Sequence, residues 1–185
     1  MDSKRKLRNI YIIIGILLMS LILYNFFWFL PVISLKTYIV DGVSMEPTFQ
    51  IGERFIVSGL YYRNHKISRG DVILFTFPKN PGSIYFKRIV ALGGEKIEIK
   101  DSKIFINGSE LDKAGSFTFD GNSVSLKQDL SISVPQNAVF VLGDNLDNSL
   151  DSRTPLMGPI DIKYIKGKVL FVYFSKDAKR IGHKI

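Results

Sequence analysis

The fold of this chain is decided by one apolar stretch, Ile84-Tyr85-Phe86-Lys87-Arg88-Ile89-Val90-Ala91-Leu92. Its short length and its β-branched and aromatic residues predict a β-strand. Because side chains alternate between the two faces of a strand, Lys87 and Arg88 point in opposite directions. Lys87 shares its face with Tyr85, Ile89 and Ala91. The strand therefore carries one lysine among apolar neighbours.

Similar short runs precede and follow this stretch, and Gly, Pro and Asn residues separate them. This pattern predicts a mainly β fold. The predicted strands besides 84–92 are 36–40, 54–58, 71–77, 96–100, 103–106, 139–142 and 168–174. Asp101-Ser102 and Asn107-Gly108 are turn signals. Residues 109–134 are more polar, and we expect them to form a β-hairpin-rich insertion or, alternatively, a long surface loop.

Composition limits the function classes. The 185 residues are 46% hydrophobic, which is enough for one domain with a genuine core. There is no cysteine, so disulfides and thiolate chemistry are excluded. The net charge is +8, but the basic residues are scattered rather than placed along one aromatic-rich element. We therefore expect membrane lipids and not nucleic acid as a partner.

Residues 10–30 form an apolar run without a charged residue. At about 1.5 Å per helical residue, such a run spans roughly 30 Å of hydrocarbon. Four basic residues, Lys4, Arg5, Lys6 and Arg8, precede it, which predicts a cytoplasmic N-terminus. We predict a protein of the cell membrane that crosses it once. It has a cytoplasmic segment 1–9, a single transmembrane anchor 10–33 and an extracytoplasmic domain 34–185.

A cleavable signal peptide is the alternative to a retained anchor. Such a peptide has an apolar core of about 7 to 15 residues, followed by a cleavage site with small residues. The present run is longer, and Phe29-Leu30-Pro31-Val32-Ile33-Ser34 offers no pair of small residues at the required spacing. We therefore expect the segment to be retained.

The first candidate catalytic residue lies in Gly42-Val43-Ser44-Met45-Glu46-Pro47-Thr48. Ile39 and Val40 indicate a strand, and Pro47 disfavours helical geometry at Glu46. Ser44 is therefore expected where the strand breaks, with its hydroxyl and N–H available to a carbonyl group. The alternative is an ordinary turn, because Ser, Gly and Pro form turns for local reasons.

A serine nucleophile needs a base, and neither histidine suits that role. His65 lies in a polar loop and His183 near the end of the chain. In Ser-Lys variants of the catalytic triad, a neutral lysine takes the proton of the serine. Burial of Lys87 would lower its pKa from about 10.4 and supply such an amine. The alternative is an edge-strand lysine that prevents aggregation.

The third candidate region is the polar run 143–153, which follows the apolar strand 139–142. Its density of polar residues predicts a binding loop or a buried hydrogen-bond network. A calcium loop is one reading of it, but the glycine and the closing glutamate are missing. Carboxylates that share a proton are another reading, but Arg153 would keep Asp151 ionised. We predict a structural ion pair between Asp151 and Arg153, and no metal site.

Together, the anchor, Ser44-Met45-x-Pro47-Thr48, Tyr85-x-Lys87-Arg88 and Gly143-Asp144-Asn145-x-x-x-Ser149-x-Asp151-Ser152-Arg153 resemble the bacterial type I signal peptidases of the Gram-positive form. These are membrane-bound serine proteases with a Ser/Lys dyad and no cofactor. Their fold is a β catalytic domain with a smaller β-rich extension. The resemblance implies substrates that are exported preproteins, cut after small residues at positions −1 and −3 of the signal peptide.

The resemblance also implies the role of each matching residue. Ser44 would be the nucleophile, Lys87 the general base, and Ser149 the residue that orients the Lys87 amine. The Asp151–Arg153 ion pair would support the dyad, and Asp144 would hold the loop beneath it.

We expect the substrate to bind as an added strand along 39–44 and 85–87. The predicted substrate-binding residues are Val40, Gly42, Met45, Tyr85 and Phe86. The chain departs from the family pattern at Gly42, where many members have a hydroxyl residue that stabilises the oxyanion. It also departs at Leu146 and at 91–95.

Three other functions are alternatives to this one. A relative working in pilus or surface-protein assembly, as a specialised peptidase or as a chaperone, is the main alternative. A non-catalytic chaperone would not need both Ser44 and Lys87. A self-cleaving LexA-type repressor would carry a DNA-binding domain in place of the anchor. A membrane-tethered binding module would leave the three motifs unrelated.

Overall fold

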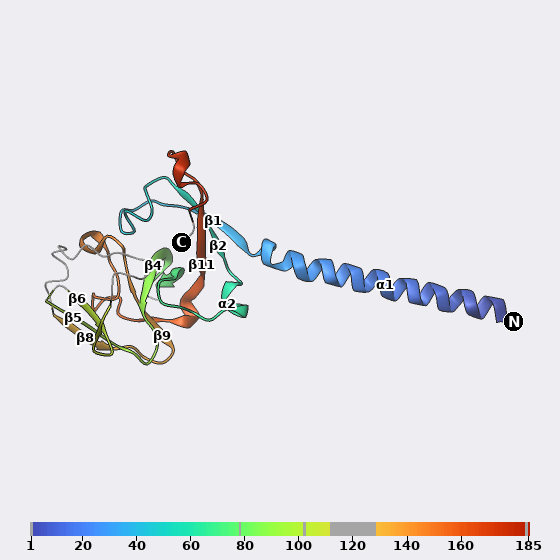
Figure 1. Ribbon diagram of the computed structural model, residues 1–185, viewed down its shortest axis with the longest axis horizontal. Helices are drawn as coiled ribbons and strands as arrows, with labels where there is room; N and C mark the ends of the chain where they lie inside the picture. Colours follow the sequence, from blue (N-terminus) through green and yellow to red (C-terminus); the bar gives the residue numbers. More distant parts are fainter. Residues whose placement is uncertain (1, 78, 102, 112–128, 184) are drawn as a thin grey trace. The chain divides into compact units, whose positions relative to one another are not determined.

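The computed structural model describes residues 2–77, 79–101, 103–111, 129–183 and 185 (Figure 1). It divides into two compact units, one up to Leu35 and one formed by Lys36–Ile185. The first unit contains helix α1 (Asp2–Ile33). Within this helix, Leu7–Phe27 is long and apolar enough to cross a membrane, with a mean hydropathy of 2.4.

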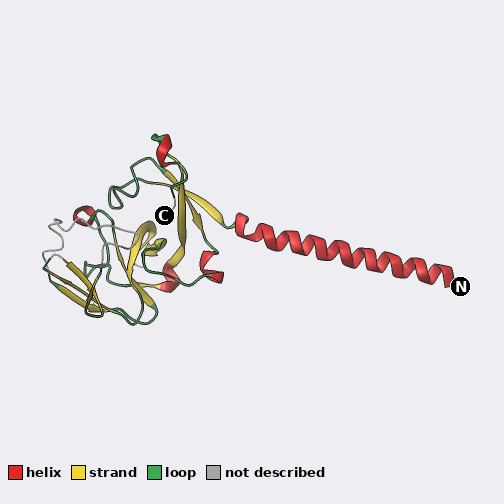
Figure 2. Cartoon of the chain, viewed as in Figure 1, coloured by secondary structure: helices red, strands yellow, loops and turns green. Residues whose placement is uncertain are grey.

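In the described part of the second unit, antiparallel strands form two sheets (Figure 2). The larger sheet has seven strands in the order β1-β2-β11-β3-β4-β9-β10, and the smaller has four in the order β7-β6-β5-β8. The strands are β1 (Leu35–Ile39), β2 (Arg54–Ser58), β3 (Val72–Phe77), β4 (Asn80–Ala91), β5 (Lys96–Lys100), β6 (Lys103–Ile106), β7 (Ser109–Glu110), β8 (Leu130–Ser133), β9 (Ala138–Leu142), β10 (Ile160–Asp161) and β11 (Ile165–Phe174). The short helices are α2 (Tyr61–Asn64), η2 (Leu146–Asn148), η3 (Ile162–Tyr164) and η4 (Ala178–Arg180). The prediction of a mainly β fold is confirmed.

The smaller sheet combines two predicted strands with the ends of the predicted insertion. β5 and β6 pair with each other, β7 adds to β6, and β8 adds to β5. Asn107 and Gly108 join β6 to β7 with φ angles of 51° and 81°, the left-handed geometry of an Asn-Gly turn. The expected alternating stretches 117–119 and 124–126 lie outside the described residues.

Strand β4 is the stretch from which the sequence prediction started. It pairs with β3 so that Lys87 faces Ile73 across the ladder. β9 pairs with the other edge of β4 only from Arg88 onward. In the part of the chain that the structure describes, residues 84–87 therefore have no strand on that second edge.

The alternation predicted along β4 ends at a bulge. The register of β4 against β9 shifts between Ile89 and Ala91. As a result, Val90 and Ala91 pack in the same core cluster, under the smaller sheet. The prediction that Ala91 shares the face of Lys87 and Ile89 was therefore wrong, because a bulge adds one residue to a strand and breaks its period of two.

A second core cluster lies beneath the turn that contains Ser44. Phe49, Phe55 and Phe86 form its centre, with ring centroids 5.0 to 5.5 Å apart. Met45 and Phe49 are both fully buried. Burial of each such side chain contributes about 1.5 to 3 kcal/mol, so the two anchor the turn to the sheet.

Candidate active site

Ser44 lies in a turn of the loop that joins β1 to β2. The base of this loop is closed by two hydrogen bonds. The Val40 N–H donates to the Glu53 carbonyl at 2.9 Å, and the Gly52 N–H donates to the Val40 carbonyl at 2.8 Å. β1 ends at Ile39, so Ser44 lies beyond the break of the strand, as predicted.

The Lys87 amine lies against the Ser44 hydroxyl, with 2.5 Å between Nζ and Oγ. Lys87 is only 3% exposed. Burial lowers its pKa to about 8, although the negative charges of Asp151 and Asp144 oppose that change. A buried lysine with such a pKa supplies neutral amine near neutral pH, which a general base requires.

A cavity of about 290 Å³ opens at this pair. Its lining residues come from the Ser44 turn, from β4 and from the loop after β9, and they are Asp41, Gly42, Ser44, Ser83, Ile84, Tyr85, Phe86, Lys87 and Leu150. Gly42, Tyr85 and Phe86 were predicted to bind substrate. Val40 and Met45, also predicted, are 1% and 0% exposed and belong to the core under the turn. Their contact with substrate stays a prediction.

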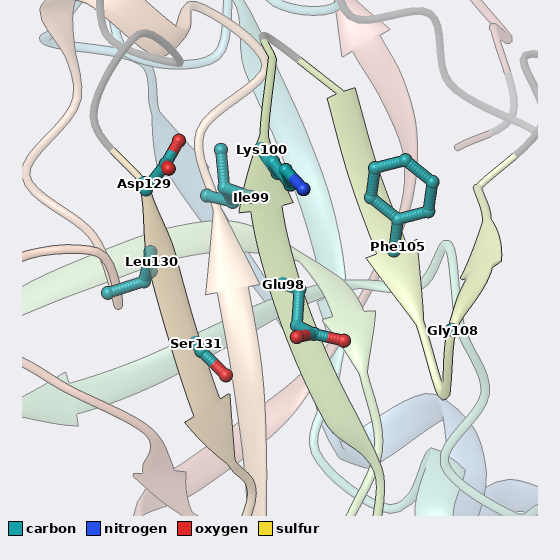
Figure 3. A pocket seen from close by; sticks show the side chains of 8 residues that line it. All are labelled: Glu98, Ile99, Lys100, Phe105, Gly108, Asp129, Leu130 and Ser131. Atoms are coloured by element: carbon teal, nitrogen blue, oxygen red, sulfur yellow. The ribbon is translucent and has the colours of Figure 1, made fainter.

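A larger cavity of about 560 Å³ lies on the smaller sheet (Figure 3). Glu98, Lys100, Phe105 and Asp129 are among the residues that line it. Neither Ser44 nor Lys87 belongs to its lining. The smaller cavity is therefore the candidate active site, because it combines a nucleophile with a base.

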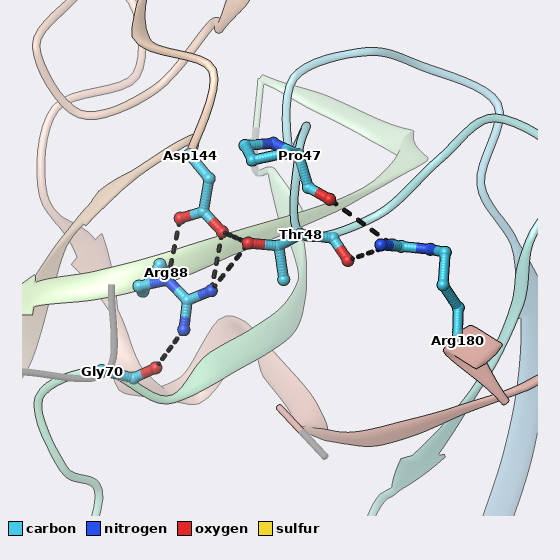
Figure 4. A network of polar contacts seen from close by, with 6 residues as sticks. All are labelled: Pro47, Thr48, Gly70, Arg88, Asp144 and Arg180. Atoms are coloured by element: carbon cyan, nitrogen blue, oxygen red, sulfur yellow. Dashed lines mark hydrogen bonds and ion pairs between the residues drawn. The ribbon is translucent and has the colours of Figure 1, made fainter. Parts of the chain in front are cut away.

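Asp144 forms a buried ion pair with Arg88, the neighbour of Lys87 in β4 (Figure 4). The guanidinium binds both carboxylate oxygens, at 2.8 and 2.6 Å. It also donates to the Gly70 carbonyl at 2.8 Å. The Thr48 hydroxyl donates to the same carboxylate at 2.5 Å. This network joins β4, the loop after β9 and the Ser44 turn.

Sequence reasoning assigned no role to Arg88 or Thr48. An arginine in the middle of an apolar strand was the available signal, because a buried guanidinium requires an anionic partner.

Asp151 and Arg153 form the predicted ion pair, with Nε–Oδ1 and Nη2–Oδ2 distances of 2.8 and 2.9 Å. Asp151 is fully buried, and its carboxylate also accepts the Gly143 N–H at 3.1 Å. Arg153 donates in addition to the Leu146 carbonyl at 2.6 Å. These bonds connect the start and the end of the loop 143–153.

This loop contacts the backbone of Ser44. The Asn145 N–H donates to the Ser44 carbonyl at 3.1 Å. Gly143 fits here because a Cβ would lie 2.4 Å from that carbonyl oxygen and 2.2 Å from Ser149 Oγ. Ser149 Oγ is buried and has no hydrogen-bond partner among the described residues. The proposed orientation of the Lys87 amine by Ser149 therefore stays a prediction.

Neither histidine is part of this arrangement. His65 and His183 are exposed, and the ring of His65 stacks on Tyr61 at 4.2 Å.

Comparisons with known proteins identify the family of this chain. Residues 8–174 match the family model described as signal peptidase, peptidase S26. Signal peptidase I P of Bacillus subtilis subsp. natto is 34% identical over 98% of this chain and 97% of its own length. Signal peptidase IB of Staphylococcus aureus is 33% identical over 74% of this chain and 76% of its own.

A solved signal peptidase I from Enterococcus faecalis is 28% identical and covers 56% of this chain and 97% of its own, with a TM-score of 0.46. The family match spans Ser44, Lys87 and the loop 143–153. The chain therefore belongs to the signal peptidase family, peptidase S26.

Proposed function

We propose that this protein is a membrane-anchored serine endopeptidase that removes signal peptides from exported preproteins. Ser44 is the nucleophile and Lys87 the general base. The observation that carries this assignment is the 2.5 Å contact between Lys87 Nζ and Ser44 Oγ at a buried amine. The membership of the chain in the signal peptidase family supports it independently.

In the first step, neutral Lys87 takes the Ser44 proton while Oγ attacks the carbonyl carbon of the last signal-peptide residue. The Ser44 N–H donates no hydrogen bond within the described residues, so it is available to the oxyanion that forms. Collapse of this intermediate expels the amine of the mature protein, which takes the proton from the Lys87 ammonium. Lys87 then activates a water molecule that hydrolyses the acyl-enzyme.

The free edge of β4 at residues 84–87 suits a substrate that binds as an added strand. Such a strand would pass the cavity beside Ser44, where Tyr85, Phe86 and Leu150 leave about 290 Å³. We propose that the side chains at positions −1 and −3 enter this cavity and are small, as the resemblance to signal peptidases implies. The −1 carbonyl is then presented to Ser44.

In this proposal, helix α1 is the membrane anchor. Four basic residues before its apolar part favour a cytoplasmic N-terminus, and the catalytic unit then lies outside the cell membrane. A preprotein in the same membrane reaches the enzyme at a raised effective concentration.

The test is cleavage of a preprotein with Ala at −3 and −1 by the full chain in detergent. We expect the wild type to cut after the −1 Ala, and both Ser44→Ala and Lys87→Ala to lose nearly all turnover while they stay folded. Lys66→Ala, at an exposed lysine, is the matched control and should keep wild-type activity. A folded wild type that leaves the preprotein intact would overturn the proposal.

A further inference from the structure

The C-terminal segment after β11 folds back along that strand. The Gly182 N–H donates to the Val172 carbonyl at 2.8 Å, and the Val172 N–H donates to the His183 carbonyl at 3.2 Å. Ile185 donates to the Leu170 carbonyl at 3.1 Å and packs against the core cluster beneath the Ser44 turn. This segment lies outside the family match, which ends at residue 174.

Helix η4 of this segment directs Arg180 at the Ser44 loop (Figure 4). Arg180 Nη2 donates to the Thr48 carbonyl at 2.8 Å and to the Pro47 carbonyl at 3.4 Å. Its Nε donates to a carboxylate oxygen of Glu53 at 2.6 Å. One guanidinium therefore binds the loop at two places.

Glu53 is the buried partner in this contact, since it is only 2% exposed. Its second carboxylate oxygen accepts the Gln50 N–H at 2.8 Å, and its carbonyl accepts the Val40 N–H that closes the loop. Burial alone would raise the pKa of Glu53, but hydrogen bonds from Arg180 and Gln50 keep that pKa below its usual value. Glu53 is therefore a charged anchor inside the loop that carries Ser44.

Thr48 is held from two directions as a result. Its hydroxyl binds Asp144, and its carbonyl accepts from Arg180. It lies four positions after Ser44 in the sequence. A lysine in place of Arg180 would keep a charge near Glu53, but it lacks the planar fork that binds carboxylate and carbonyl at once.

We propose that Arg180 is a positioning residue that holds the Ser44 turn so that the hydroxyl stays within reach of Lys87. This inference rests on the proposed function of Ser44 and Lys87. A mutation far from the reacting atoms that misplaces them by about 1 Å can cost about 100-fold in rate. Loss of Arg180 therefore lowers turnover without removing a group that touches substrate.

The activity test compares Arg180→Ala, Arg180→Lys and Lys179→Ala as full chains in detergent. We expect Arg180→Ala to lower kcat about 10- to 100-fold with little change in KM. Arg180→Lys should keep the thermal midpoint of the wild type and still recover only part of kcat. Lys179 lies in the same helix and is exposed, so Lys179→Ala should behave as the wild type. A wild-type kcat in Arg180→Ala, or a loss that matches the unfolded fraction, would overturn the inference.

Hydrogen exchange provides a test that does not depend on activity. The Phe49 N–H is bonded to the Met45 carbonyl and the Gln50 N–H to Glu53, so both report on the loop. Both should exchange at least tenfold faster in Arg180→Ala, and at the wild-type rate in Lys179→Ala. If the wild type does not cleave preprotein, the proposed function fails, and the exchange rates still decide the inference. Unchanged exchange in Arg180→Ala would refute it.

Discussion

Replacing Lys87 with methionine should make the protein more stable while it abolishes activity. Burial lowers the pKa of Lys87 from 10.5 to about 8. At about 1.4 kcal/mol for each tenfold change in proton affinity, the folded state disfavours the ammonium by about 3 kcal/mol at pH 7. Methionine removes that cost but also removes the hydrogen bond to Ser44, which contributes about 1 kcal/mol. The expected net gain is about 2 kcal/mol.

The gain must depend on pH in one direction. Because the pKa of Lys87 is lower in the folded than in the unfolded state, the unfolded chain binds more protons between about pH 8 and pH 10.5. Wild-type stability therefore rises with pH across this window relative to Lys87→Met. At pH 10 the cost to the wild type falls to about 1 kcal/mol, and the two proteins should be about equally stable.

The assay is urea unfolding of both proteins in detergent micelles, followed by circular dichroism at pH 7 and pH 10. Lys66→Met, at an exposed lysine, serves as the control and should change the free energy of unfolding by less than about 0.5 kcal/mol at either pH. An equal difference between Lys87→Met and the wild type at both pH values would show that burial does not disfavour the ammonium. The basis for assigning Lys87 as the general base would then be lost.

Three further results follow from the same geometry. The kcat/KM for preprotein cleavage should rise with pH, and the midpoint of this rise should lie near pH 8, because only neutral Lys87 accepts the Ser44 proton. A midpoint above pH 10 would contradict this. Asp144→Asn removes the carboxylate charge that pairs with the buried Arg88, so urea unfolding should show a loss of about 3 kcal/mol, and a loss below about 1 kcal/mol would contradict the role of the pair. Ser149→Ala removes a buried hydroxyl without a partner, so stability should stay equal or rise by up to about 1 kcal/mol, and a clear loss would reveal a hydrogen bond. If Ser149→Ala also lowers kcat, Ser149 acts on Lys87 during the reaction.

Most of the strands could be predicted from the sequence because their signals are local. A strand of period two shows its apolar face in five or six residues. The apolar neighbours of Lys87 favoured either its burial or an edge-strand position, and the structure shows the side chain buried. The turn at Ser44 followed from Pro47 and Gly42 in the same way. Family resemblance then connected the dyad residues, which lie 43 positions apart.

Contacts that join distant positions were not visible in this way. Thr48 and Asp144 are 96 residues apart, and Arg180 and Glu53 are 127 apart, so neither pair leaves a local pattern. β10 is only two residues long and shows no period. The bulge places Ala91 in the same core cluster as Val90. It depends on the pairing of β4 with β9, which the sequence of one strand does not show.

The adjacency of Lys87 and Arg88 in β4 has a consequence for how this protein can change in evolution and in the laboratory. The two side chains are each 3% exposed and serve opposite faces of the sheet. Deleting one residue between positions 84 and 87 would slip the register and bring a guanidinium, which never becomes neutral, to Ser44. A change of length by one residue within 84–87 is therefore expected to separate Lys87 from Ser44. Length differences between functional homologues should fall outside this range.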